Sequence, residues 1–334
     1  MIVALEVQIR EPSDILSPNA DLLKRVVLAI SAFRSDTEVV RLLEQVFAHG
    51  ISPFAGVLVV DSLTSGAIER AIDTNGWPVT FHNSQVNLGA AGNLRKRMEL
   101  AARFDADWCY ALNGDSEFKL ETILALVRCG AGKRRVGAIF PARANSSADQ
   151  RWSRAGTSFL PFRSPLTNEA TPPAEREVAW ASSNGALYHL EPARNGLFVW
   201  TDLWHAWEDM AYSWLLSVHG WKQIACSEAV FVDGYERRAV RLFGRRFHIH
   251  DKPPWLSYYS IRNLAIFVHR TKAGLAGWAL VDSRLFQESA LTIMYRDNKL
   301  ARLTYLARGL VDGLRKRTGM TVSPTPTNPK GGAW

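Results

Sequence analysis

The chain has 334 residues, of which 47% are hydrophobic and 22% are charged, a composition typical of a globular protein and not of a disordered or fibrous one. No apolar run approaches the roughly 20 residues that a membrane-spanning helix needs, and we expect no signal peptide, because the first residues lack a basic start before an apolar stretch. The three cysteines, Cys109, Cys129 and Cys226, are too widely spaced for a metal or redox motif, which favours a reducing cytoplasm.

The net charge of +8 is distributed unevenly along the chain. Residues 1–236 hold 22 Lys/Arg and 27 Asp/Glu, a net charge of −5, whereas residues 237–317 hold 17 basic and 5 acidic residues, a net charge of +12. A basic C-terminal third on an acidic body predicts one face that meets anions, such as phospholipids, nucleotide phosphates or nucleic acid.

Strands and helices are predicted to alternate through the first part of the chain. The four apolar strands are expected at residues 24–33, 56–62, 77–83 and 107–115. The first intervening helix starts at Ser35, where Ser35 and Glu38 form a capping-box pattern, and ends at Gly50. This alternation predicts a doubly wound, mostly parallel α/β sheet, whose ligands bind beyond the carboxyl ends of the strands.

The second part of the chain is less regular. Residues 141–178 are polar and contain prolines, so we expect loops there, followed by a strand within 180–190. A helix opening on Glu208-Asp209 and a strand ending at Asp233 come next, and helices are expected from about residue 272 onward. The last helix carries a leucine stripe at helical spacing, formed by Leu300, Leu303, Leu306, Leu310 and Leu314.

Polar residues stand at three of the predicted strand ends: Phe33-Arg34, Asp61-Ser62 and Asn113-Gly114-Asp115. The Asp61 carboxylate is suited to accept hydrogen bonds from a uracil or ribose, although a turn aspartate is the ordinary structural alternative. Asp115 is suited to hold Mg²⁺ or Mn²⁺ on a pyrophosphate, and the Asn113 side chain can add a neutral oxygen. The alternative for this stretch is a plain strand-end turn, for which Asn-Gly is a strong signal.

Two helix starts allow a functional and a structural interpretation. Glycines in "NLGAAGN", residues 87–93, let backbone N–H groups approach a phosphate, or they form only a strand-to-helix turn. Glu208 and Asp209 either complement the helix dipole or supply a general base that deprotonates an acceptor hydroxyl. Six of the twelve tryptophans lie between residues 180 and 221, and tryptophan faces pack well on sugar rings, which favours the second interpretation.

The order of these segments resembles a known family. In sequence, "VLVVDS", "NLGAAGN", "YALNGDS", "SSNGALY", "WEDMAYSWLLSVHGW", "EAVFVDG" and "YYSIRN" resemble the inverting nucleotide-sugar glycosyltransferases of the GT-A fold (glycosyltransferase family 2). The likeness covers about residues 25–318 and is strongest to the rhamnosyl- and galactofuranosyltransferase branch of bacterial surface-glycan synthesis. It implies transfer with inversion from a nucleoside-diphosphate sugar, most often UDP- or dTDP-linked, to a glycan or lipid-linked acceptor.

The resemblance also implies a domain organisation. A segment of residues 1–24 precedes a GT-A catalytic domain of residues 25–270, with a donor half at about 25–130 and an acceptor half at about 140–250. Basic helices follow at 271–320, and a disordered tail at 321–334. The protein would work in the cytoplasm, peripherally at the inner face of the cell membrane if the basic helices meet anionic lipid. Whether it forms a homodimer stays an open question.

Site residues follow from the resemblance position by position. Phe33, Arg34, Asp61, Asn113 and Gly114 would bind the donor nucleotide. Ser183, Trp207 and Glu208 would lie on the acceptor side, and Asp209 would be the general base. Asp115 and Asp233 would hold the divalent cation, Mg²⁺ or Mn²⁺. Tyr259, Arg262 and Asn263 match the "YY..RN" stretch of the family, and their role stays open.

Departures from the family pattern concern the metal. Asn113 replaces the first carboxylate of the D-x-D motif, and Asp233 stands where the family often has a histidine. We therefore expect a weakened metal site that binds its cation well only with the donor present.

Two alternatives remain. The first is a nucleotide-sugar-binding protein that has lost catalysis, which the half D-x-D allows. The second is a basic module that docks on membrane or nucleic acid through residues 237–317. No nucleic-acid-binding motif occurs in that region, so we expect no nucleic-acid partner.

Overall fold

The computed structural model describes residues 19–63, 65–144, 151–152, 174–232, 238–242, 244–249 and 252–324. Its main sheet is formed by β1 (Val26–Ala32), β2 (Gly56–Asp61), β3 (Val79–Asn83), β4 (Trp108–Asn113), β5 (Val136–Ala144), β6 (Arg151–Trp152), β7 (Glu175–Glu177), β8 (Ala186–His189) and β9 (Lys222–Val232). The helices around it are α2 (Ala20–Leu23), α3 (Asp36–Val46), α4 (Ala67–Asn75), α5 (Gly89–Ala101), α6 (Leu120–Gly130), α7 (Leu190–Arg194) and α8 (Glu208–Val218).

The strand order of the sheet is β3-β2-β1-β4-β8-β5-β9-β7, with β6 paired to β5. Strands β1 to β4 pair in parallel, and β8 is antiparallel to both β4 and β5. The register sets Ala32 of β1 against Asp61 of β2, and Ser31 against Asn113 of β4. The predicted polar strand ends therefore meet at one edge of a mostly parallel sheet, and the predicted fold class is confirmed.

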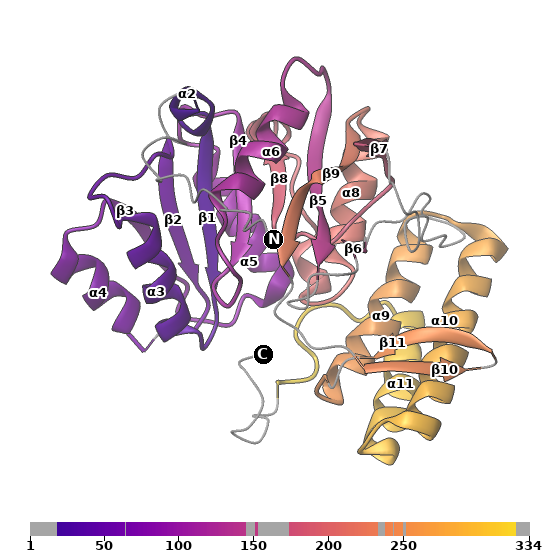
Figure 1. Cartoon of the computed structure of the whole chain (residues 1–334). Helices are drawn as coiled ribbons and strands as arrows, with labels where there is room; N and C mark the ends of the chain where they lie inside the picture. The colour runs from indigo at the N-terminus through magenta and orange to yellow at the C-terminus, as the bar shows by residue number, and fades with distance from the viewer. Residues whose placement is uncertain are drawn as a thin grey trace, which may run out of the picture.

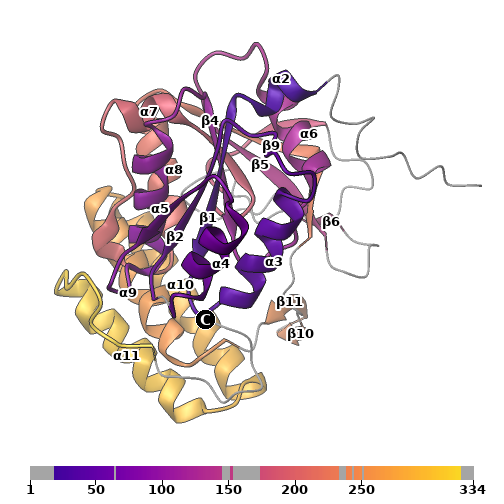
Figure 2. The same ribbon diagram turned by 90° about the vertical axis from the view of Figure 1, so that its left-hand side faces the viewer.

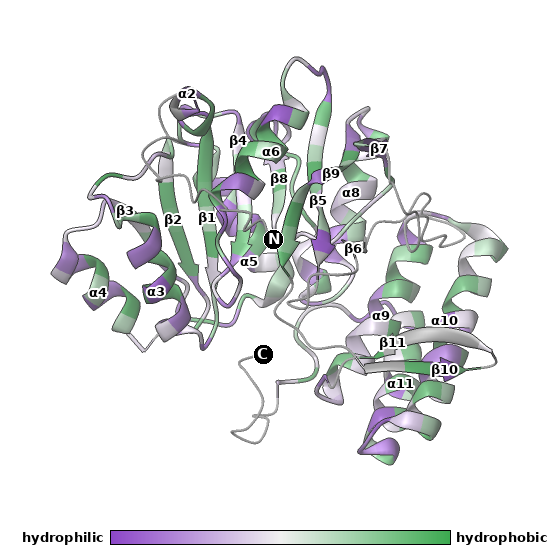
Figure 3. Cartoon of the chain, in the orientation of Figure 1, coloured by the Kyte–Doolittle hydropathy of each residue, from purple (hydrophilic) through white to green (hydrophobic). Residues whose placement is uncertain are grey.

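Helices cover both faces of this sheet, as Figure 2 shows. Apolar residues of α3, α4 and α6 pack on one face, and those of α5, α7 and α8 pack on the other. Strand β1 supplies both cores, because Leu28 and Ile30 point to the first and Val27 and Ala29 to the second. Burial on both faces explains why the central strands are continuous apolar runs, which appear green in Figure 3.

A C-terminal helical extension lies beside the sheet (Figure 1). It consists of α9 (Trp255–Arg270), α10 (Gly274–Tyr295) and α11 (Lys299–Leu314), and a hairpin of β10 (Arg238–Leu242) and β11 (Arg245–Ile249) packs against α10. Thirteen of the sixteen α9 residues are buried, so α9 is the centre of this extension. Helix α9 begins well before residue 272, from which the sequence pattern predicted the C-terminal helices.

Helix α11 packs on α9 closely at two glycines, and only part of the leucine stripe is buried there. A Cβ atom on Gly309 would lie 2.4 Å from the Tyr258 carbonyl oxygen, and one on Gly313 would lie 2.8 Å from the Ala265 Cβ. Among the stripe residues, Leu306 is buried, but Leu300 and Leu314 are 80% and 55% exposed. The leucine spacing therefore correctly predicted a helix here, and the two glycines let its backbone approach α9 closely.

Two local predictions differ from the structure. The Ser35 hydroxyl makes no cap hydrogen bond to α3 and instead accepts one from the Phe33 N–H at 3.3 Å. The region 141–178, predicted as loops, contains the end of β5 together with β6 and β7, while its remaining parts fall largely outside the described residues. In the part of the chain that the structure describes, no helix has the length and hydropathy for crossing a membrane.

Candidate functional site

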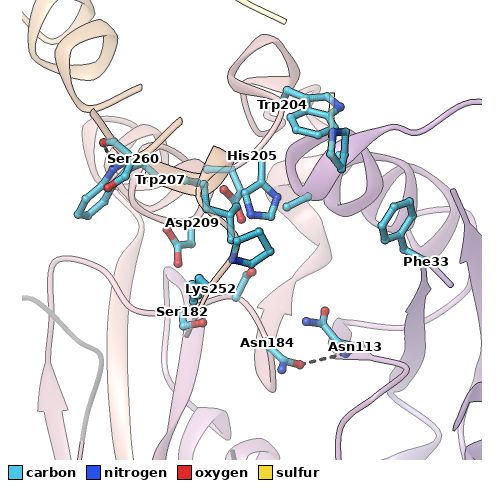
Figure 4. A pocket seen from close by; sticks show the side chains of 18 of the residues that line it. Phe33, Asn113, Ser182, Asn184, Trp204, His205, Trp207, Asp209, Lys252 and Ser260 are labelled. Atoms are coloured by element: carbon cyan, nitrogen blue, oxygen red, sulfur yellow. Dashed lines mark hydrogen bonds between the residues drawn. The ribbon is translucent and has the colours of Figure 1, made fainter. Parts of the chain in front are cut away.

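A cavity of about 580 Å³ opens at the carboxyl edge of the sheet. Its walls come from the ends of β1 and β4, the start of α5, the segment that leads into α8, and the helices α9 and α10. Eight of the predicted site residues line it in three groups: Phe33, the turn Asn113–Asp115, and Ser183 with the segment 207–209. Figure 4 shows Phe33 and Asn113 on one side of the cavity and Trp207 and Asp209 on the other.

The turn after β4 is built on glycine. The Gly114 N–H donates to the Ser31 carbonyl at 2.8 Å, and a Cβ atom at Gly114 would lie 2.3 Å from the Val39 side chain. The Asn113 N–H donates to the Asn184 side-chain oxygen at 2.9 Å, a bond drawn in Figure 4. This packing holds the turn against α3 and the segment before β8, and Asp115 is exposed at the cavity wall.

The other donor-side predictions fall in different places. Arg34 is exposed, with its guanidinium carbon 5.2 Å from the Phe33 ring centroid, but it does not line the cavity. Asp61 is fully buried, and its carboxylate accepts a hydrogen bond from the Leu63 N–H at 3.0 Å. Its neighbour Ser62 lines the cavity, whereas Asp61 lies just behind it.

The acidic pair begins α8 after a strained segment. Trp204, Ala206 and Trp207 all have positive φ, between 62° and 69°, which is rare for residues with a side chain. Burial, and then the neighbouring Asp209 carboxylate, raise the pKa of Glu208 to about 8. One Glu208 oxygen is buried without a hydrogen-bond partner among the described residues. Glu208 is therefore mostly protonated at neutral pH, beside Asp209.

Residues of the "YY..RN" stretch hold this strained segment in place. The Asn263 side-chain amide donates to the carbonyls of Leu203, His205 and Ala206, at 2.9, 2.5 and 3.0 Å. The buried Arg262 guanidinium also donates to Leu203 O, at 2.7 Å, and the Trp207 indole donates to Ser260 O at 2.7 Å. The stretch thus fastens the backbone that precedes the acidic pair, a role the sequence left open.

Trp204 packs against the start of α5 and is hydrogen-bonded to it. The Ala91 N–H donates to the Trp204 carbonyl at 3.1 Å, and the Trp204 indole donates to Asn87 O at 3.2 Å. Gly89 has φ +65°, and a Cβ atom there would lie 2.2 Å from the Trp204 carbonyl oxygen. Gly89 of "NLGAAGN" therefore allows close contact with Trp204, while a Cβ atom at Gly92 would meet Leu88.

The donor set fits a cation held mainly by substrate phosphates. Asp115 offers one carboxylate at the cavity wall, and Asn113 beside it offers a neutral oxygen. No group of three or more His, Cys, Asp or Glu side chains suited to a metal occurs among the residues that are described. Asp233 lies outside the described residues. A cation with one or two protein carboxylates and substrate phosphates in its shell is an ordinary magnesium arrangement.

Several cavity residues had no sequence signal. The buried Arg97 donates to the carbonyls of Ala29 and Leu112, both at 3.2 Å, and burial lowers its pKa to about 10. A second group comes from the segment before α9 and from the C-terminal helices. It consists of Lys252, Arg284, Glu288, Arg296 and Arg302. These side chains lie far from the other site residues in sequence, so only the fold brings them together.

No protein-family model and no curated protein matches the chain by sequence. Solved structures do match. The mannosyltransferase PcManGT from Pyrobaculum calidifontis, in complex with GDP-Man and Mn²⁺, is 14% identical over 88% of each chain, with a TM-score of 0.54. S. aureus TarS 1–349 is 10% identical over 88% of this chain and 82% of that one, with a TM-score of 0.54, and its complex with UDP-GlcNAc gives 0.51. These likenesses confirm the expected GT-A fold.

Proposed function

We propose that the protein is a glycosyltransferase that moves a sugar from a nucleoside-diphosphate sugar to an acceptor hydroxyl with inversion. One observation carries the proposal: a single cavity has the Asn113–Asp115 turn on one side and the Glu208-Asp209 pair on the other. Nucleotide sugars in the similar structures, GDP-Man in PcManGT and UDP-GlcNAc in TarS, support this donor class.

In the proposed mechanism the donor and acceptor halves of the chain, residues 25–130 and 140–250, meet in this cavity. Phe33 packs on the donor nucleotide, with Arg34 and Asp61 close to it. Ser183 and Trp207 border the acceptor. Asp209 accepts the proton of the acceptor hydroxyl while its oxygen attacks the anomeric carbon from the face opposite the diphosphate. A single displacement inverts the configuration, and Glu208, protonated near neutral pH, leaves Asp209 as the charged partner of the pair.

Asp115 would hold a divalent cation, Mg²⁺ or Mn²⁺, together with Asn113 and, in a lesser role, Asp233. When bound, such a cation offsets the negative charge that develops on the leaving diphosphate. The Mn²⁺ in the PcManGT complex supports a cation of this kind. The acceptor would be a glycan or lipid-linked molecule of a bacterial surface-polysaccharide route, and UDP- and dTDP-sugars are the first donors to test, with GDP-sugars beside them.

Removal of the Asp115 carboxylate should separate donor binding that depends on the cation from donor binding that does not. We expect Asp115→Ala to abolish the gain in donor affinity that Mn²⁺ gives the wild type, and Asp233→Ala to reduce it less, because oxygen-ligand charge tunes these sites. Calorimetry with donor, with and without Mn²⁺, measures both. Donor affinity that is the same in EDTA and in Mn²⁺ for the wild type would show that Asp115 is not a metal ligand.

The basic C-terminal helices should bind anionic membrane surfaces. Phe286 and Ile293, seven residues apart on α10, are 64% and 55% exposed, and Arg315–Arg317 are exposed at the end of α11. Basic residues near an acidic leaflet contribute about 1 kcal/mol each. We expect the protein to co-sediment with phosphatidylglycerol vesicles. This binding should be lost when residues 315–317 are changed to glutamate, and it should remain in the control variant Arg41→Glu on α3. Equal binding to neutral vesicles would contradict this.

A panel of nucleotide sugars tests the proposed function first. UDP-, dTDP- and GDP-sugars are added to the protein with Mn²⁺, and the melting temperature is measured. Because a ligand that binds the folded state raises stability by mass action, at least one sugar nucleotide should raise it in a concentration-dependent way. A panel in which no nucleotide sugar shifts the melting temperature would argue against the proposal.

A further inference from the structure

The far end of the cavity is lined by charged residues of α10 and of the turn that follows it. Arg284, Glu288 and Arg296 form this wall, and Lys252, just before α9, lies beside them. None of the four has a part in the mechanism proposed above. Arginines and lysines in a cavity wall act as binding groups when their charge is not fully balanced by the protein itself.

The two arginines are fixed by one carboxylate between them. Arg284 Nη2 lies 2.7 Å from one Glu288 oxygen, and Arg296 Nη1 lies 2.5 Å from the other. The side chains of Glu288 and Arg296 are only 7% and 13% exposed. Burial alone would raise the pKa of Glu288, but Arg284 and Arg296 hold it below its usual value, so the carboxylate is ionised. Glu288 thus orients two guanidinium groups and carries one charge against their two.

Within this pairing two guanidinium groups share one carboxylate. The Lys252 ammonium adds a third positive charge, close enough to act electrostatically on Glu288, Glu208 and His205. The Nε atoms of Arg284 and Arg296 are buried and have no hydrogen-bond partner among the described residues. Donor groups that are buried and unpaired are costly unless a ligand satisfies them. Two guanidinium groups on one carboxylate, with a lysine beside them, suit the oxygens of a phosphate or carboxylate, which an arginine fork can bind in pairs.

This charged wall lies on the acceptor side of the cavity. The Arg284 guanidinium carbon is 5.9 Å from the centroid of the Trp207 ring, and Trp207 directly precedes the acidic pair. In Figure 4, Trp207 lies across the cavity from Phe33 and Asn113, which border the donor side. A ligand group bound by Arg284 would therefore sit beyond Asp209, as seen from the donor diphosphate.

We infer that Arg284, Arg296 and Lys252 form a binding site for an oxyanion on the acceptor, so that the sugar is transferred to an acceptor bearing a phosphate or carboxylate. That the bound anion belongs to an acceptor rests on the proposed function. The anion-binding site itself does not depend on it. Glu288 acts as a built-in counter-ion that holds the arginines ready and competes with the incoming anion. An anionic acceptor would be held with its hydroxyl turned toward Asp209.

The test uses inorganic phosphate and glucuronate as probes, without any nucleotide sugar. Both are titrated against the full chain at constant ionic strength, with sodium chloride as the reference salt, and the melting temperature is measured. We expect phosphate, glucuronate or both to raise it, and the larger shift shows which oxyanion the site prefers. Arg284→Gln and Arg296→Gln should each lose at least half of the shift. Glu288→Gln should show a larger shift than the wild type, because the competing carboxylate is gone.

Arg270→Gln is the matched control. Arg270 is also paired with a carboxylate, that of Asp202, and is as exposed as Arg284, but it does not line the cavity. Its anion-induced shift should equal that of the wild type. If the four variants and the wild type shift alike, or if neither anion stabilises the wild type beyond chloride, the arginines form only a structural ion-pair network and the inference is wrong. Because no donor is present, this outcome would leave the nucleotide-sugar panel unaffected.

Discussion

Asp209→Asn is expected to lower the rate of sugar transfer by about 10²- to 10⁴-fold, the usual contribution of a general base. Asparagine keeps the size of the side chain and its hydrogen bond from the Met210 N–H, which Asp209 Oδ1 accepts at 2.8 Å. The start of α8 should therefore stay folded, and only the ability to accept a proton is removed. Donor affinity, measured by calorimetry, should change little, because Asp209 lies across the cavity from Phe33 and Asn113.

Glu208→Gln is the comparison that separates the two carboxylates. With the pKa of Glu208 raised to about 8, the wild-type side chain is neutral at pH 7, and glutamine resembles that state. The variant should therefore keep a much larger share of activity at pH 7 than Asp209→Asn does. As pH rises through about 8, wild-type Glu208 ionises beside Asp209 while glutamine cannot, so the pH profiles of the two proteins should diverge above pH 8. Asp209→Asn retaining more than about a third of wild-type turnover would contradict its role as a base.

Asn263→Leu is expected to lower turnover by about 10²-fold, the effect of misplacing a reacting group by about 1 Å. Leucine has a similar size but cannot donate to the carbonyls of Leu203, His205 and Ala206. The Leu203 carbonyl keeps its hydrogen bonds from Arg262 and the His205 N–H, but the His205 and Ala206 carbonyls lose the Asn263 donor, and each carbonyl left unsatisfied costs about 1–3 kcal/mol. The strained segment at Trp204–Trp207 then has a lower-energy backbone available. Glu208 and Asp209 directly follow this segment, so they should lose their position.

The measurement for Asn263→Leu compares turnover with donor affinity at a temperature where the variant is folded. Turnover should fall while the donor dissociation constant stays within about threefold of the wild type, a range below 1 kcal/mol. Asn75→Leu is the control, because the Asn75 amide also donates to a backbone carbonyl, that of Ala71 at 2.8 Å, but on α4, away from the cavity. Normal turnover in folded Asn263→Leu would show that the Asn263 hydrogen bonds do not position the acidic pair.

The parts of the site that the sequence predicted are those governed by local pattern. Apolar runs ending in polar residues placed Asn113–Asp115 at the edge of the sheet, and the helix-start pattern placed Glu208 at the first residue of α8. Both depend on neighbours a few residues away, and so they can be recognised without the fold.

The remaining parts depend on contacts between distant residues. Asn263 acts on carbonyls 57 to 60 residues earlier in the chain, which no local spacing records. Arg284 lies on α10 and Arg296 directly after it, and only the packing of the helical extension beside the sheet brings them to the cavity. The close approach of α11 to α9 at Gly309 and Gly313 likewise depends on residues far away in the sequence.

The release of nucleoside diphosphate from nucleotide sugars tests the proposed sugar transfer most directly. Wild type, Asp209→Asn and Asp115→Ala are incubated with each UDP-, dTDP- and GDP-sugar in Mn²⁺, and free nucleoside diphosphate is measured with and without a bacterial lipid and glycan extract. We expect the wild type to consume at least one sugar nucleotide, faster with the extract, and both variants to lose this release. A wild type that binds a nucleotide sugar but never releases nucleoside diphosphate above the level of Asp209→Asn would contradict it and identify a binding protein without catalysis.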